Sequence, residues 1–286
     1  MGPPAVRMSN DFACRLRKKR MSFFTRLADR VSRTDSVLSV GLDPAPGRLP
    51  DAVAGAELPR WAFNRRIIDA THNHAACFKP NAAFYEDSDG WRALEETVAY
   101  AHGKDVPVVL DAKRADIGST ARQYATVLET VDAVTVNPYL GRDSVDPFLQ
   151  APGGVFLLCR SSNDGAADLQ TLELATGEPV YERVAALASD WGEDVGLVVG
   201  ATAPAELEAV RAAAPELPFL VPGVGAQNGD PEAAVKHGLV DGVGLINSSR
   251  KVIFAGETAR TRTSDEYFTA AGAAAKQLKR RLNRYR

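Results

Sequence analysis

Short apolar runs alternate with amphipathic stretches along most of the chain. The runs are rich in β-branched residues and almost continuously hydrophobic, which is typical of parallel strands that are buried on both faces. Eight runs are predicted to be strands: Val37–Leu42, Ala75–Lys79, Val106–Leu110, Ala133–Val136, Val155–Leu158, Val195–Val199, Phe219–Val221 and Gly242–Ile246. Helical patterns precede, separate and follow them: Phe23–Val31, Trp61–His72, Trp91–His102, Ser119–Glu129, Arg142–Leu149, Val180–Trp191, Pro204–Ala213, Pro231–His237 and Asp265–Arg284.

This alternation predicts an α/β protein with a single domain, the (β/α)8 or TIM barrel, over residues 21–286. Such a barrel typically needs about 250 residues. A doubly wound open sheet is the rival architecture, but it seldom uses eight regularly spaced units. The longest irregular connection, Arg160–Glu178, is rich in Ser, Asn, Asp and Gly and is interpreted as an active-site loop. Residues 1–20 are predicted to form a disordered basic N-terminal extension. No long apolar stretch follows their basic run, so they are not predicted to be a secretory signal. An upstream start codon chosen in error, with Met21 as the true start, and a basic targeting arm are the alternatives.

Composition limits the kinds of molecule that the protein is expected to bind. The net charge of -2 predicts no general attraction to nucleic acid or to an anionic membrane, so an anionic substrate must be bound by local donors. No apolar run approaches the roughly 20 residues that a membrane span needs. The three cysteines, Cys14, Cys77 and Cys159, are far apart, which argues against a disulfide framework or a structural zinc site and favours a cytoplasmic location.

Charged residues gather where the predicted strands end, which is where barrel enzymes place their chemistry. Asp111 and Lys113 are two residues apart, so a regular strand would point both side chains into the barrel mouth. Asp116 begins the next turn, and Lys79 ends the neighbouring strand. A lysine held among carboxylates stays protonated and is a good proton donor. The alternative interpretation is that Asp116 caps a helix and that Asp111 and Lys113 form a structural ion pair.

The loops after the last two strands are the usual phosphate site of a barrel. Pro222–Gln227 contains two glycines whose N–H groups can approach a phosphate closely, and Gln227 is placed to cover it. Arg250 adds a bidentate donor just after the eighth strand. The pair His72 and His74 is not expected to bind metal, because residues i and i+2 of a helix face different sides.

The run from Asp111 to Thr120 resembles the DxKxxDI…T signature of the orotidine 5'-phosphate decarboxylases. Further motifs follow the order of that family: GLDP at 41–44, FKPN at 78–81, Ser-Ser-Asn at 161–163, PGVGAQ at 222–227 and SR at 249–250. The resemblance covers nearly the whole predicted barrel, and its motif variants are similar to those of the longer bacterial and archaeal branch. It implies decarboxylation of orotidine 5'-phosphate to UMP in de novo pyrimidine synthesis, without cofactor or metal.

The resemblance also implies a role for each residue of the charge array. Lys113 would stabilise the carbanion left at C6 and then protonate it. Asp111 would crowd the carboxylate of the substrate. Asp43 and Lys79 would hold ribose hydroxyls, and Lys79 would belong to the array as well.

The remaining implied residues complete the array or bind the substrate. Three of them would reach the site across a homodimer interface: Asp116, Ile117 and Thr120. Four others would contact the pyrimidine or the 5'-phosphate: Ser162, Gln227, Ser249 and Arg250. Position 249 carries Ser where many members have Gly, and its backbone N–H is expected to serve the phosphate all the same.

Two other functions use similar residues. A related sugar-phosphate decarboxylase or aldolase would bind Mg2+ with the DxKxxD residues to stabilise an enediolate. A non-catalytic barrel would only bind a nucleotide or a partner. The pairing of two lysines with two aspartates, together with FKPN, favours the metal-free enzyme, and a dead site has no need for so costly a cluster. Activity in the presence of a strong chelator would separate the two enzymes.

Overall fold

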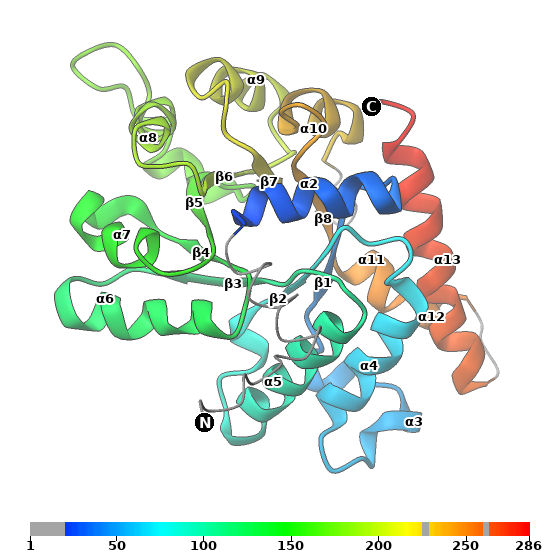
Figure 1. Ribbon diagram of the computed structural model, residues 1–286. Coiled ribbons are helices and arrows are strands. Elements are labelled where there is room, and N and C mark those ends of the chain that lie inside the picture. The colour runs from blue at the N-terminus through cyan, green and yellow to red at the C-terminus, as the bar shows by residue number, and fades with distance from the viewer. Residues whose placement is uncertain (1–20, 225–228, 260–262) are drawn as a thin grey trace, which may run out of the picture.

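The computed structural model describes residues 21–224, 229–259 and 263–286. Eight parallel strands form one sheet in the order β2-β1-β8-β7-β6-β5-β4-β3. Bridges between Phe78 and Val108 and between Asn81 and Asp111 join the two end strands, so the sheet curls into a nearly closed barrel surrounded by helices (Figure 1). The strands are β1 (Leu38–Leu42), β2 (Cys77–Pro80), β3 (Val109–Arg114), β4 (Ala133–Val136), β5 (Gly154–Arg160), β6 (Val195–Val199), β7 (Phe219–Val221) and β8 (Leu245–Ser248). The prediction of a single-domain (β/α)8 barrel is confirmed.

Helices connect successive strands and cover the barrel. They are α2 (Phe23–Thr34), α3 (Asp51–Ala54), α4 (Pro59–Thr71), α5 (Ser88–Gly103), α6 (Gly118–Ala125), α7 (Arg142–Leu149), α8 (Val180–Ser189), α9 (Pro204–Ala213), α10 (Pro231–Gly238), α11 (Arg250–Ile253), α12 (Ala255–Thr258) and α13 (Ser264–Leu282). One predicted helix is divided: the segment expected at Ser119–Glu129 is α6 followed by a tighter 3-10 turn at Thr126–Glu129.

The predicted limits of several strands were wrong, although every predicted run overlaps a strand. The third strand was expected at Val106–Leu110 but runs from Val109 to Arg114, and the eighth starts and ends later than expected, at Leu245 and Ser248. At the carboxyl ends of these strands, the error has one cause. Hydrogen bonding of the backbone defines a strand, and it continues through polar residues that a hydrophobicity pattern assigns to loops.

Helix α2 closes the amino-terminal end of the barrel. Its Arg30 donates to the carbonyl oxygen of Ala75, just before β2, at 3.1 and 3.3 Å. The rings of Phe23 and Phe24 meet Phe156 of β5 edge to face, with centroids 6.0 and 5.5 Å apart. A site in this barrel is therefore expected at the opposite end, where the strands reach their carboxyl termini.

Burial along the strands shows where the barrel opens. Strands β1, β2, β4, β6, β7 and β8 are buried at every position. Strand β3 is buried at Val109 and Leu110 but becomes accessible from Asp111 onward, and β5 opens at Leu158 and Arg160. The accessible ends of β3 and β5 thus mark the mouth of the barrel.

Cys77 and Cys159 are buried free thiols on β2 and β5, which agrees with their interpretation as packing residues. Cys14 lies outside the described residues. Within the described ranges, no helix combines the length and the apolar character that crossing a membrane requires.

Asp132 links α2 to the floor of the barrel. Its carboxylate accepts from Arg26 of α2 at 2.5 Å, from His102 Nε2 at 2.7 Å and from the N–H of Val108 at 2.9 Å. Burial alone would raise the pKa of Asp132, but these donors outweigh it and lower the pKa to about 2.

Asp132→Asn is expected to destabilise the protein in a pH-dependent way. The unfolded carboxyl titrates near pH 3.9, so the stabilisation by Asp132 is complete above about pH 5 and disappears as the pH falls through about 2. The variant should lose roughly 2 kcal/mol of unfolding free energy at pH 7, and the difference from wild type should shrink towards pH 2. Urea unfolding at several pH values measures this, with Asp29→Asn, on the exposed face of α2, as the control. A deficit that is equal at every pH would contradict it.

Candidate active site

Two lysines share one carboxylate at the carboxyl ends of β2 and β3. Lys79 Nζ lies 2.7 Å from Asp111 Oδ2, and Lys113 Nζ lies 2.5 Å from Asp111 Oδ1. The side chains of Lys79 and Asp111 are 5% and 13% exposed, whereas that of Lys113 is 48% exposed. Lys79 is therefore the more buried lysine of the array, and Lys113 is the more accessible one.

The charge states in this array support one another. Burial would lower the pKa of Lys79, but the negative charges of Asp111 and Asp43 outweigh it and raise the pKa. Burial would raise the pKa of Asp111, but Lys79 and Lys113 hold it well below the ordinary range. Lys79 and Asp111 are consequently both charged at neutral pH.

Lys113 does not follow the regular pleat on which its prediction was based. Leu110 pairs with Val134 and Arg114 with Val136, so β3 carries extra residues against β4 and forms a bulge. Lys113 has a φ of 49°, in the left-handed region. Its side chain meets Asp111 as expected, but a distorted strand brings the two together.

Thr135 on β4 is a site residue that sequence reasoning missed. It is 1% exposed, and its hydroxyl contacts Asp111 Oδ1 at 3.1 Å. Thr135 Oγ1 also accepts from the N–H groups of Ala112 and Lys113 at 3.0 and 2.9 Å. A signal was present, because Thr135 is the polar residue in an otherwise apolar strand beside the DxK strand.

Unsatisfied polar atoms lie at the ends of β1 and β8. Asp43 Oδ1 and Ser249 Oγ are buried and have no hydrogen-bond partner among the described residues. Buried polar atoms are normally paired, so such atoms indicate a place where a ligand completes the bonding. Gly41 allows the two ends to approach, since a Cβ there would lie 2.5 Å from Ser249 Cβ.

The segment around Ser162 is held in the loop after β5. Gln170 accepts from the N–H of Ser161 at 2.8 Å and donates to its hydroxyl at 2.9 Å. That hydroxyl donates to Asn163 at 2.7 Å. Thr202, after β6, donates to the carbonyl oxygen of Ser162 at 3.2 Å. Gln170 was not predicted, because nothing in an irregular loop marks one polar residue above another.

Asp116, Ile117 and Thr120 lie where α6 begins, apart from the array. The carboxylate of Asp116 accepts from the N–H of Ile117 at 2.8 Å and forms no salt bridge with any described residue. Ile117 occupies the N-cap position, so the interpretation of Asp116 as the cap was wrong. Ile117 is 57% exposed, and after the neighbouring β4 Tyr139 is 80% and Leu140 45% exposed. Ile117, Tyr139 and Leu140 are thus exposed apolar side chains that follow the carboxyl ends of the neighbouring strands β3 and β4.

The expected phosphate-binding residues are described only in part. Arg250 is exposed and is the first residue of α11, directly after Ser249. Gly223 has a φ of 100°, which glycine adopts freely. Gln227 lies outside the described residues.

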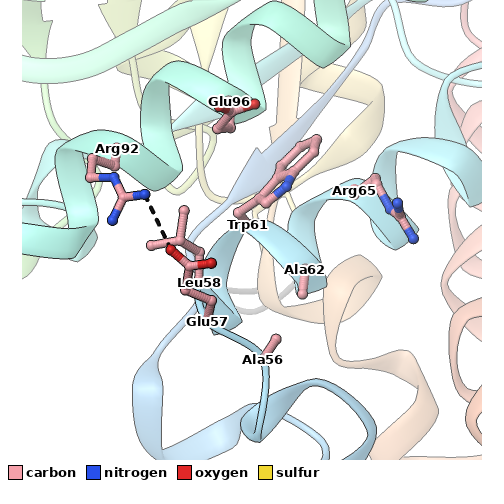
Figure 2. A pocket seen from close by; sticks show the side chains of 8 residues that line it. All are labelled: Ala56, Glu57, Leu58, Trp61, Ala62, Arg65, Arg92 and Glu96. Atoms are coloured by element: carbon pink, nitrogen blue, oxygen red, sulfur yellow. Dashed lines mark hydrogen bonds and ion pairs between the residues drawn. The ribbon is translucent and has the colours of Figure 1, made fainter.

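A surface hollow of about 450 Å³ lies on the outside of the barrel, between α4, α5 and the chain before α4 (Figure 2). Arg92 and Glu57 face each other across it at 3.4 Å, beside Trp61. Its lining contains none of the charged residues of the strand ends. The hollow is therefore separate from the candidate site.

The fold and the charge array define the class of protein: a (β/α)8-barrel enzyme with its site at the carboxyl ends of the strands. The model of the orotidine 5'-phosphate decarboxylase / HUMPS family matches residues 36–262. The chain belongs to this family.

Individual relatives agree. An orotidine 5'-phosphate decarboxylase of Halorubrum lacusprofundi is 70% identical over 277 residues, covering 93% of this chain and 100% of the relative. One of Azoarcus sp. is 48% identical with the same coverage. The structure of Leishmania donovani OMP decarboxylase is 42% identical with a TM-score of 0.77, covering 93% of this chain and 98% of that chain.

Gly41→Ala is expected to disturb the approach of β1 to Ser249. The new Cβ would overlap Ser249 Cβ and would lie 3.2 Å from its Cα, so the backbone must move. Overpacking of this kind costs roughly 1–3 kcal/mol of unfolding free energy. Denaturant unfolding measures the loss, and Gly47→Ala, where nothing lies within 4 Å of the new methyl, is the control. Equal stability of the two variants would contradict the close contact.

Proposed function

We propose that this protein decarboxylates orotidine 5'-phosphate to UMP without a metal ion, and that Lys113 protonates C6 of the pyrimidine. The observation that carries the proposal is the accessible Lys113 ammonium, fixed beside the buried pair of Lys79 and Asp111 on the scaffold of this family. The pathway that this reaction serves is pyrimidine synthesis, and the small number of cysteines favours the cytoplasm as its location.

The reaction needs a positive charge in a fixed place. The bond between C6 and the carboxylate breaks, CO2 leaves as a neutral molecule, and the electron pair stays on C6. No adjacent carbonyl group delocalises this pair fully, so a preorganised cation must stabilise it. Lys113 supplies that charge and then transfers a proton from Nζ to C6, and solvent returns a proton to the amine.

Asp111 acts on the substrate before CO2 leaves. Its carboxylate is held charged by both lysines, so it repels a substrate carboxylate placed against it, and the repulsion disappears when neutral CO2 departs. Both of its oxygens are engaged by ammonium groups. In the magnesium-dependent alternative this carboxylate would face a metal ion, so its present partners support the metal-free reaction.

The remaining residues bind the parts of the substrate that do not react. Asp43, with its unsatisfied oxygen, and Lys79 hold ribose hydroxyls. Ser162 contacts the pyrimidine. The 5'-phosphate is bound by Gln227, by Arg250 and by the backbone N–H of Ser249. Interactions with such a remote group contribute to catalysis when they position the reacting group.

The site is shared between two copies of the chain. Asp116, Ile117 and Thr120 enter the partner's barrel mouth and complete its charge array. Two observations support this arrangement. The carboxylate of Asp116 has no salt bridge among the described residues, and Ile117, Tyr139 and Leu140, which follow the neighbouring strands β3 and β4, are apolar and exposed.

Lys113→Ala is expected to abolish turnover in a folded protein. Loss of orotate absorbance, followed with purified protein, orotidine 5'-phosphate and a strong chelator, should proceed for wild type and for Lys236→Ala, whose lysine pairs with Glu232 on the outer helix α10. The Lys113 variant should be slower by at least about 10⁴-fold, because both the stabilising charge and the proton donor are lost. Turnover near the wild-type rate in the variant, or dependence of the wild type on a divalent metal, would refute the proposal.

Mixing two inactive variants tests the shared site. Lys113→Ala and Asp116→Ala homodimers should each be inactive, but a heterodimer has one intact site. Random exchange of subunits should restore about a quarter of wild-type activity, because half of the dimers are mixed and each has one working site of two. Activity should rise after co-refolding at a ratio of one to one. No recovery, despite exchange demonstrated with tagged subunits, would mean that each chain builds its site alone.

A further inference from the structure

We propose that Thr135 is a positioning residue for this reaction: its hydroxyl holds the bulge of β3 in the one arrangement that brings Asp111 and Lys113 together. The inference rests on the proposed function.

The bulge creates the need for such a residue. Between the paired positions Leu110 and Arg114, β3 has three residues where β4 has one, Thr135. A bulge leaves backbone groups without partners in the sheet. The N–H groups of Ala112 and Lys113 are in this position, and both donate to Thr135 Oγ1, at 3.0 and 2.9 Å.

The hydrogen-bonding capacity of the hydroxyl is used completely. A threonine hydroxyl has two acceptor sites and one donor. Because the N–H groups of Ala112 and Lys113 occupy both acceptor sites, its hydrogen is left to point to Asp111 Oδ1, 3.1 Å away. In this contact the hydroxyl can only donate, so it favours the ionised form of Asp111, whose carboxylate oxygen accepts. A β-branched side chain that is 1% exposed also has little freedom to rotate.

These contacts also fix the position of the Asp111 carboxylate in the charge array. Asp111 Oδ1 receives both Thr135 and Lys113, while Oδ2 receives Lys79. The plane of the carboxylate is thus set from β2 on one side and from β4 on the other. Thr135 also holds the backbone N–H of Lys113, whose φ of 49° is unfavourable for a residue with a Cβ. Without the Thr135 hydroxyl, both the Asp111 carboxylate and the backbone that carries the Lys113 side chain can shift.

The test compares Thr135→Val, which keeps the shape and removes the hydroxyl, with Thr135→Ser, which keeps the hydroxyl. Thr71→Val is the matched control, because Thr71 is also fully buried but its hydroxyl donates to the Ile67 carbonyl within α4. Steady-state decarboxylation of orotidine 5'-phosphate and hydrogen exchange of the Ala112 and Lys113 amides are measured for the wild type and for these three variants.

The valine variant should lose about 100-fold in kcat with KM changed by less than about threefold, because a small misplacement of reacting groups acts on the chemical step. Its Ala112 and Lys113 amides should exchange at least about 10-fold faster, since they lose their acceptor. The serine variant should stay within about 10-fold of the wild-type kcat and keep slow exchange. Thr71→Val should keep its kcat even if its melting temperature falls.

A valine variant that retains kcat within about threefold, or serine and valine variants that are equally slow, would overturn the inference. Should Thr135→Val fail to fold, Thr135→Ala against Thr135→Ser makes the same comparison of hydroxyl removed and hydroxyl kept. A wild-type protein without decarboxylation would overturn the proposed function instead. The amide exchange rates would then still decide whether the hydroxyl holds the bulge.

Discussion

One carboxylate shared between two ammonium groups is the interaction on which the candidate site depends. Asp111 allows Lys79 to remain charged although it is buried, and it holds Lys113 at the accessible edge of the barrel mouth. Neither lysine alone would be placed in this way, since a buried ammonium without a partner loses its proton and an exposed one moves freely. The barrel provides the rest by bringing the ends of β2, β3 and β4 to one rim.

Most of the fold could be predicted from the sequence, because eight nearly continuous apolar runs leave few architectures that bury them. The runs predicted strand number, order and parallel direction. The ends of the strands could not be predicted in the same way. Val109–Arg114 continues as a strand through Asp111 and Lys113, where hydrophobicity stops but backbone pairing does not. The role of α2 in closing the barrel floor was also missed, because it depends on contacts such as that of Arg26 with Asp132, distant in sequence.

Site residues could be predicted where the residue type itself indicates chemistry, but not where their role depends on the geometry of the backbone. Asp111, Lys113 and Lys79 could be selected because charged residues at the ends of buried strands are costly without a purpose. Thr135 could not be selected, since its role depends on a bulge in β3 that the pattern of side chains does not predict. Asp116 illustrates a third case: a single chain leaves it without a salt bridge among the described residues, and its proposed role requires a second copy.

The central claim is that the Lys113 ammonium faces the carbon from which CO2 departs and that this ammonium stays hydrogen-bonded to Asp111. A crystal structure of the protein with UMP bound tests this most directly. The account predicts Lys113 Nζ at about 3 Å from C6 of the base, within reach of a proton transfer, and still in contact with Asp111. An amine directed to solvent, or a base bound at another face of the barrel, would contradict it.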